Sequence, residues 1–90
     1  MNRELRGRPA VTLRRVFERP RRADIRWTEV EALLISLGAL ISQGRGSRVR
    51  VLLNDTRAVF HRPHPRQEMN KGSVASLERF LKAAGIEPED

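Results

Sequence analysis

The spacing of apolar residues changes twice along this chain, and this change constrains the fold more than any other feature. Apolar side chains recur at helical spacing over residues 28–37, and Gly38 ends that pattern. Three short segments with alternating apolar residues follow: 39–43, 48–53 and 57–61. Helical spacing returns after Asn70 and ends at Gly85. The sequence therefore predicts a helix, a three-stranded antiparallel meander and a second helix.

The predicted sheet has one apolar face. Along the second strand the order is Arg48, Val49, Arg50, Val51, Leu52 and Leu53. If Ala58 and Phe60 point to the core in the third strand, Val59 and His61 share the open face with the arginines. Three short strands are not stable alone, and both helices must cover their apolar face. The predicted fold class is α+β, with the other face of the sheet open.

Polar residues are predicted to cap the two helices. Thr28 caps the first, with Glu29 in its first turn and Trp27 before it as a hydrophobic staple. Core packing of Trp27 is therefore favoured over base stacking. Asn70 caps the last helix, which has an apolar side made of Val74, Leu77, Phe80 and Leu81.

Residues 1–25 are expected to form a basic N-terminal extension. A short apolar patch consists of Val11, Leu13, Val16 and Phe17. It predicts about two turns of helix with Thr12 as the N-cap, ordered only if the patch docks on the rest of the protein. Residues 26–87 form the predicted domain, and residues 88–90 form an acidic tail.

Positive charge is concentrated in two regions of this chain of net charge +7. Residues 1–27 hold nine arginines against three acidic residues, a net charge of +6, and residues 45–71 hold seven basic residues against two acidic ones. Such a distribution favours a polyanion, because each neutralised phosphate releases condensed counterions. The alternative is a solvated charged surface with a basic tail.

Several classes of site and location are excluded by composition. Without cysteine there is no disulfide, thiolate zinc site or cysteine nucleophile, which is typical of a reducing interior, so a cytoplasmic protein is expected. No apolar run approaches the ~20 residues of a membrane span. Two histidines make no metal site. Gly44-Arg45-Gly46 is too short for a nucleotide-binding loop, so no small-molecule cofactor is expected.

The C-terminal half carries an ordered set of motifs. A His-Pro loop, an acidic residue, Lys-Gly and the start of a helix lie within residues 64–77, and an Ala-Gly-Ile stop lies within 82–86. The pair Leu33-Leu34, the run Leu37-Gly38-Ala39 and the step Gly46-Ser47 precede them in the matching order. Over residues 26–87 the chain resembles the HicA family of toxin–antitoxin systems.

This resemblance implies a fold like that of a double-stranded-RNA-binding domain. It also implies an mRNA interferase activity that needs no metal, and a HicB-like antitoxin that blocks the RNA face. RNA rather than DNA is the implied substrate, with the 2′-hydroxyl as both discriminator and nucleophile.

The chain departs from the family at the expected catalytic histidine. The family usually reads Gly-Ser-His at the start of the second strand, whereas here Arg48 follows Gly46-Ser47. Metal-free cleavage needs a group that takes the proton of the 2′-hydroxyl near neutral pH, as histidine does and arginine does not. Arg48 instead suits the binding of a phosphate.

His61 and His64 are the remaining candidates for catalysis. His61 either takes over proton transfer across the sheet from Arg48 or is a polar residue that ends an exposed strand, and His64 either acts in catalysis or shapes the loop. Predicted RNA-binding residues are Arg45, Ser47, Arg48, Arg50 and Lys71. Of these, Lys71 is either a solvated charge or a phosphate clamp at a helix N-terminus.

Three functions are consistent with these features. The first is a HicA-like toxin that binds mRNA on the open face and cleaves it through His61 or His64. The second is a catalytically inactive RNA-binding or antitoxin-binding module of the same fold. The third is a basic adaptor that binds protein or DNA through residues 1–25.

Overall fold

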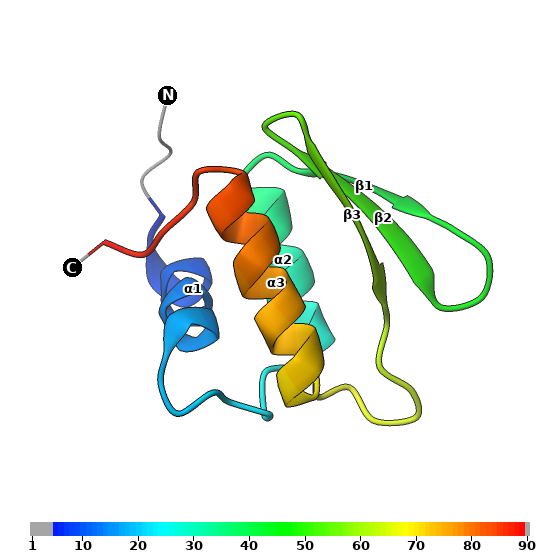
Figure 1. Cartoon of the computed structure of the whole chain (residues 1–90), viewed down its shortest axis with the longest axis horizontal. Helices are drawn as coiled ribbons and strands as arrows, with labels where there is room; N and C mark the ends of the chain where they lie inside the picture. The colour runs from blue at the N-terminus through cyan, green and yellow to red at the C-terminus, as the bar shows by residue number, and fades with distance from the viewer. Residues whose placement is uncertain (1–4, 90) are drawn as a thin grey trace.

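A computed structural model describes residues 5–89 of the chain. Its elements in chain order are α1 (Gly7–Phe17), α2 (Trp27–Ser36), β1 (Leu40–Gln43), β2 (Arg48–Leu53), β3 (Thr56–His61) and α3 (Lys71–Ala83). The strands form one antiparallel sheet in the order β1-β2-β3 (Figure 1). From α2 to α3 this is the predicted helix, meander and helix, and the α+β fold class is confirmed. Residues 1–4 of the predicted extension and residue 90 of the predicted tail lie outside the described residues.

The register of the sheet is determined by a two-residue turn between β2 and β3. Asn54 and Asp55 adopt φ values of 48° and 64°, as this kind of hairpin turn requires. Thr56 therefore pairs with Leu53, and β3 begins one residue before the predicted segment 57–61. The same register sets Arg48 opposite His61.

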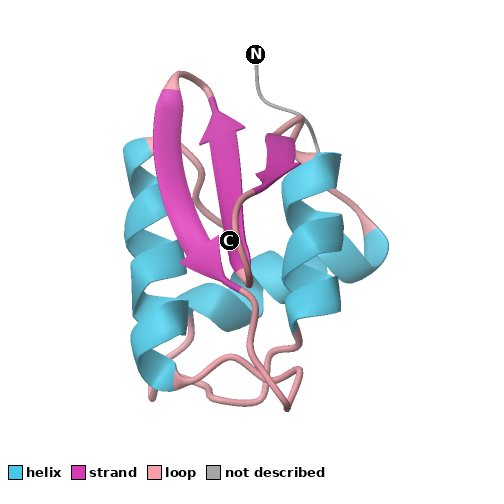
Figure 2. Cartoon of the chain, turned by 90° about the vertical axis from the view of Figure 1, so that its right-hand side faces the viewer, coloured by secondary structure: helices cyan, strands magenta, loops and turns pink. Residues whose placement is uncertain are grey.

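Helices α2 and α3 cover the apolar face of the sheet, as predicted. The inward residues of β2 are at most 2% exposed: Val49, Val51 and Leu53. Phe60 of β3 lies 6.4 Å from Trp27 of α2 and 5.6 Å from Phe80 of α3 between ring centroids. Trp27 is thus a core residue. No helix crosses in front of β2 or β3 on the side seen in Figure 2.

Two predicted helix starts were wrong. Helix α2 begins at Trp27, before Thr28, because the Glu29 carboxylate accepts the backbone N–H of Arg26 at 3.0 Å and caps the first turn there. Thr12 is buried in the middle of α1, which begins at Gly7. The Asn70 cap is confirmed, since its side chain accepts the N–H of Ser73 at 2.8 Å.

Helix α1 adds a third layer to the fold. It packs mainly on α2 and also on α3, on the side of these helices away from the sheet (Figure 1). Leu13 and Val16 are 5% and 0% exposed and join the main core. The apolar patch of residues 11–17 is therefore docked on the domain.

Candidate nucleic-acid interface

The open face of the sheet is formed by three rows of paired residues. Across the strands the rows are Leu40–Leu52–Arg57, Ser42–Arg50–Val59 and Arg48–His61. The side chains of Arg48, Arg50 and His61 are exposed. The structure therefore brings three of the predicted site residues to neighbouring positions on one face, as the alternation of the sequence indicated.

Ser47 lies beside His61 at the end of the sheet. The backbone N–H of Arg62 donates to the Ser47 carbonyl at 2.9 Å, which continues the pairing of β2 and β3 by one residue. The Ser47 hydroxyl oxygen lies 3.5 Å from Nδ1 of His61. Ser47, Arg48 and His61 thus form one group of neighbouring side chains.

Gly44 leaves space next to this group. Its N–H donates to the Arg48 carbonyl at 2.8 Å, so the two residues are paired across the hairpin. A Cβ atom on Gly44 would lie 3.0 Å from the Cβ of Arg48. The Arg48 side chain therefore stands between His61 on one side and a bare backbone on the other.

Both predicted catalytic histidines line one hollow below the sheet. The hollow measures about 340 Å³, and its lining includes His61, His64, Arg62, Arg66 and Asn70. The loop that carries His64 is attached to the start of α2. Its anchors are hydrogen bonds from the N–H of Met69 to the carbonyl of Ile25 (2.8 Å) and from the N–H of Trp27 to the carbonyl of Gln67 (2.9 Å).

Arg45 and Lys71 lie at the margins of this region. Arg45 is exposed in the turn between β1 and β2, and Lys71 is the first residue of α3, next to Asn70 in the hollow. The Asn70 side chain already accepts a hydrogen bond from the backbone N–H of Ser73. One of the free N–H groups that a phosphate would need at this helix terminus is therefore taken.

The arginines between residues 15 and 26 have acidic partners. Arg19, Arg21 and Lys82 surround Glu78, at 3.0, 2.6 and 3.1 Å. Arg15 pairs with Glu29, and Arg22 pairs with Glu18 and Asp24. The hydrogen bond from Arg22 holds the pKa of Asp24 below its ordinary value.

The cations of the open face are different. Among residues 5–89, no ion pair is formed by Arg45, Arg48, Arg50, Arg57 or Arg66. Free guanidinium groups favour phosphate binding, because no internal carboxylate has to be displaced first. Unpaired positive charge therefore gathers on the sheet and its flanking loops, and a smaller share lies on α1, where Arg8 and Arg14 form no ion pair with a described residue.

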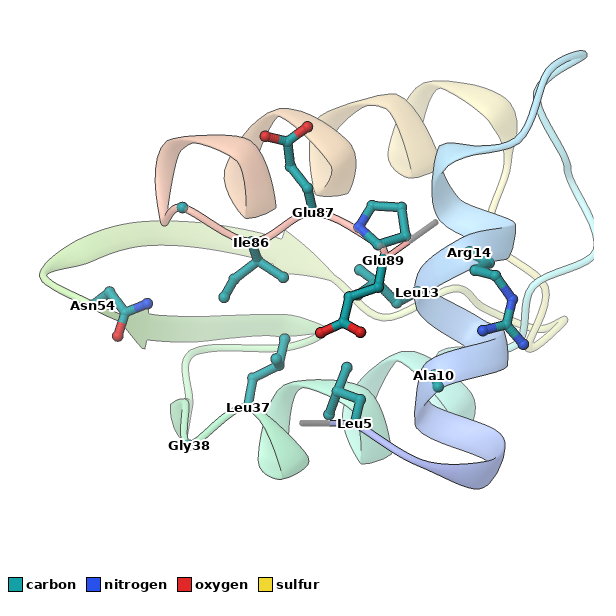
Figure 3. A pocket seen from close by; sticks show the side chains of 12 residues that line it. Leu5, Ala10, Leu13, Arg14, Leu37, Gly38, Asn54, Ile86, Glu87 and Glu89 are labelled. Carbon is teal, nitrogen blue, oxygen red and sulfur yellow. The ribbon is translucent and has the colours of Figure 1, made fainter. Parts of the chain in front are cut away.

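A second hollow of about 410 Å³ lies between α1, the end of α2 and the C-terminal segment. In Figure 3, Leu5, Leu37 and Ile86 surround a common space together with the carboxylate of Glu89. None of the predicted site residues lines it. Its mixture of apolar and acidic groups does not suit a nucleic acid.

No group of three or more His, Cys, Asp or Glu that could hold a metal ion is present in residues 5–89. Over the same residues, no helix has the length and apolar character needed to cross a membrane.

The match to a known family comes from residues 27–86, which fit the model of the HicA toxin of bacterial toxin–antitoxin systems. The chain belongs to this family. No curated protein and no solved structure gave a significant match. Membership places the chain among the toxins of bacterial toxin–antitoxin systems, and α1 lies outside the part that matches HicA.

Three features of this HicA site were missed in the sequence. Arg57 shares the open face with Val59 and His61, and strict alternation along β3 was sufficient to find it. Arg62 and Arg66 line the hollow because the proline-rich loop after β3 places them near His61, and no periodic pattern in the sequence predicts the course of that loop.

Proposed function

We propose that this HicA toxin binds mRNA across the open face of the sheet and cleaves it without a metal ion. The observation that carries the proposal is the pairing of Arg48 with His61, with Ser47 in contact. A guanidinium fork and an imidazole side by side are the two groups that metal-free cleavage of RNA requires. Arg45, Arg50 and Lys71 hold the flanking phosphates.

In the proposed reaction, Nε2 of His61 takes the proton of a ribose 2′-hydroxyl. The 2′-oxygen then forms a bond to the adjacent phosphorus, and the bond from phosphorus to the 5′-oxygen breaks. His64, which lines the same hollow, acts in its protonated form and donates a proton to the leaving 5′-oxygen. Arg48 stabilises the charge that develops on the phosphate oxygens. The products are a 2′,3′-cyclic phosphate and a 5′-hydroxyl.

We further propose that a HicB-like antitoxin neutralises this toxin in the cytoplasm by covering the same face. Leu40 of β1 and Val59 of β3 are 69% and 56% exposed there and rank among the exposed large hydrophobic residues of the described chain. With Leu52, the cross-strand partner of Leu40, these residues form an apolar strip beside the free arginines. Such a surface suits a protein partner that presents both apolar and acidic groups.

A second function is favoured by Arg48 itself, which stands where the resemblance to the family led us to expect a catalytic histidine. A module that binds RNA or antitoxin without cutting would keep the arginine face and need no base. One experiment separates the two functions: cleavage of a long mRNA by the purified chain in EDTA, beside His61→Ala, His64→Ala and Arg48→His.

Cleavage by the wild type that His61→Ala abolishes supports the interferase. Absence of cleavage by the wild type, together with a gain in Arg48→His, supports the inactive module. Loss of cleavage in His64→Ala alone would place the essential base in the loop instead of the sheet and contradict the role given to His61.

A further inference from the structure

We infer that Ser47 is a positioning residue that holds His61 in the tautomer needed for proton abstraction. The inference rests on the proposed function, because it specifies which ring nitrogen of His61, the proposed base, carries the proton. In neutral histidine one ring nitrogen carries the proton and the other is free to accept one, and the partner of the first nitrogen decides which is which.

Among the described residues, Ser47 is the one whose side chain contacts Nδ1 of His61. The hydroxyl oxygen lies 3.5 Å from Nδ1, at the long end of a hydrogen bond, and catalytic hydrogen bonds in free proteins often shorten when substrate binds. When Nδ1–H donates to this oxygen, Nε2 keeps its lone pair. Nε2 can then accept the proton of the 2′-hydroxyl.

The backbone holds Ser47 in place for this contact. Its carbonyl accepts the N–H of Arg62 at 2.9 Å, directly after His61 in the chain. On the other side, Arg48 is the cross-strand partner of His61. His61 therefore has a fixed neighbour at Nδ1 and a phosphate-binding group beside it, while the imidazole itself stays exposed to substrate.

The test uses the full chain labelled with ¹⁵N-histidine. Ring nitrogen shifts of the neutral form report the tautomer, and His64→Gln assigns the two histidines. We expect the Nδ1–H form of His61 in the wild type, a shift towards the Nε2–H form in Ser47→Ala, and recovery in Ser47→Thr, which keeps the hydroxyl. Ser42→Ala removes an exposed serine from the neighbouring row and should leave the tautomer unchanged.

Cleavage of mRNA by the same variants gives the second readout. We expect kcat to fall about tenfold in Ser47→Ala and to recover in Ser47→Thr, a fraction of the effect of losing the base itself. An unchanged tautomer in Ser47→Ala would overturn the inference, even if the wild type cleaves RNA through His61. A changed tautomer with no cleavage by the wild type would instead support the role of Ser47 and refute the interferase.

Discussion

The position of the Arg48 side chain depends on the absence of a side chain at Gly44. Since a Cβ there would lie 3.0 Å from the Cβ of Arg48, Gly44→Ala must displace the Arg48 side chain from its position beside His61 by a few tenths of an ångström. We expect RNA affinity to fall about three- to tenfold. The stability should change by less than about 1 kcal/mol, because both residues are at the exposed end of the hairpin and alanine restricts the unfolded chain.

Gly46→Ala is the matched control for this prediction. Gly46 adopts φ +60°, and nothing lies within 4 Å of a Cβ built on it. The variant should lose about 1–2 kcal/mol through the left-handed backbone and keep its RNA affinity. Filter binding and chemical denaturation measure the two quantities. Equal affinities of Gly44→Ala and the wild type would show that the position of Arg48 is not critical.

Glu78 joins the N-terminal segment to α3. It is 4% exposed, and the hydrogen bond from Arg19, followed by those from Arg21 and Lys82, holds its pKa at about 2, below the ordinary 4.5. Glu78→Gln should lower the free energy of unfolding by about 1–3 kcal/mol, between the values of exposed and buried ion pairs.

The pH dependence of stability provides a direct check of the role of Glu78. Above pH 4.5 the carboxylate is charged in both states, and its contribution is complete. Between pH 4.5 and about 2 the unfolded chain binds a proton at this residue before the folded one does, so the contribution falls and is lost below about 2. Denaturation at a series of pH values should show a flatter profile in Glu78→Gln. Parallel profiles would contradict this role.

The elements differ in how far the sequence predicts them. The open face followed directly from alternation, because a period of two assigns every residue of a strand to one side. The docking of α1 did not follow, because a patch as short as Val11 to Phe17 is ordered only by the surface that α2 and α3 leave uncovered. The contact of Ser47 with His61 depends on the extra pairing beyond β2 and β3, which has no signature in residue type.

The whole molecule has an apolar strip where an antitoxin is proposed to dock, and Leu40 is its most exposed residue. Leu40→Glu should lower the affinity for a HicB-like antitoxin by at least about tenfold, since the new charge would be buried without a partner. Ile35→Glu is the control, because Ile35 is 62% exposed and belongs to α2 and not to the open face of the sheet. Calorimetric titration with the antitoxin measures both. Similar losses in the two variants would place the antitoxin elsewhere.

The distribution of paired and free cations predicts where the molecule binds RNA. Deleting residues 1–25 cannot test this, because Leu13, Val16 and Ile25 belong to the core. Charge reversal can: Arg48→Glu and Arg8→Glu change the net charge equally, and Arg8 is exposed at the start of α1, where an acidic residue suits the helix.

If the sheet binds three to five phosphates, log affinity should fall with log salt at a slope of about −2 to −3.5. Arg48→Glu should then reduce both the affinity and the slope, whereas Arg8→Glu should change them little. A larger effect of Arg8→Glu would favour the adaptor that binds through its N-terminal region, and a slope near zero would exclude phosphate contacts as the source of affinity on either surface.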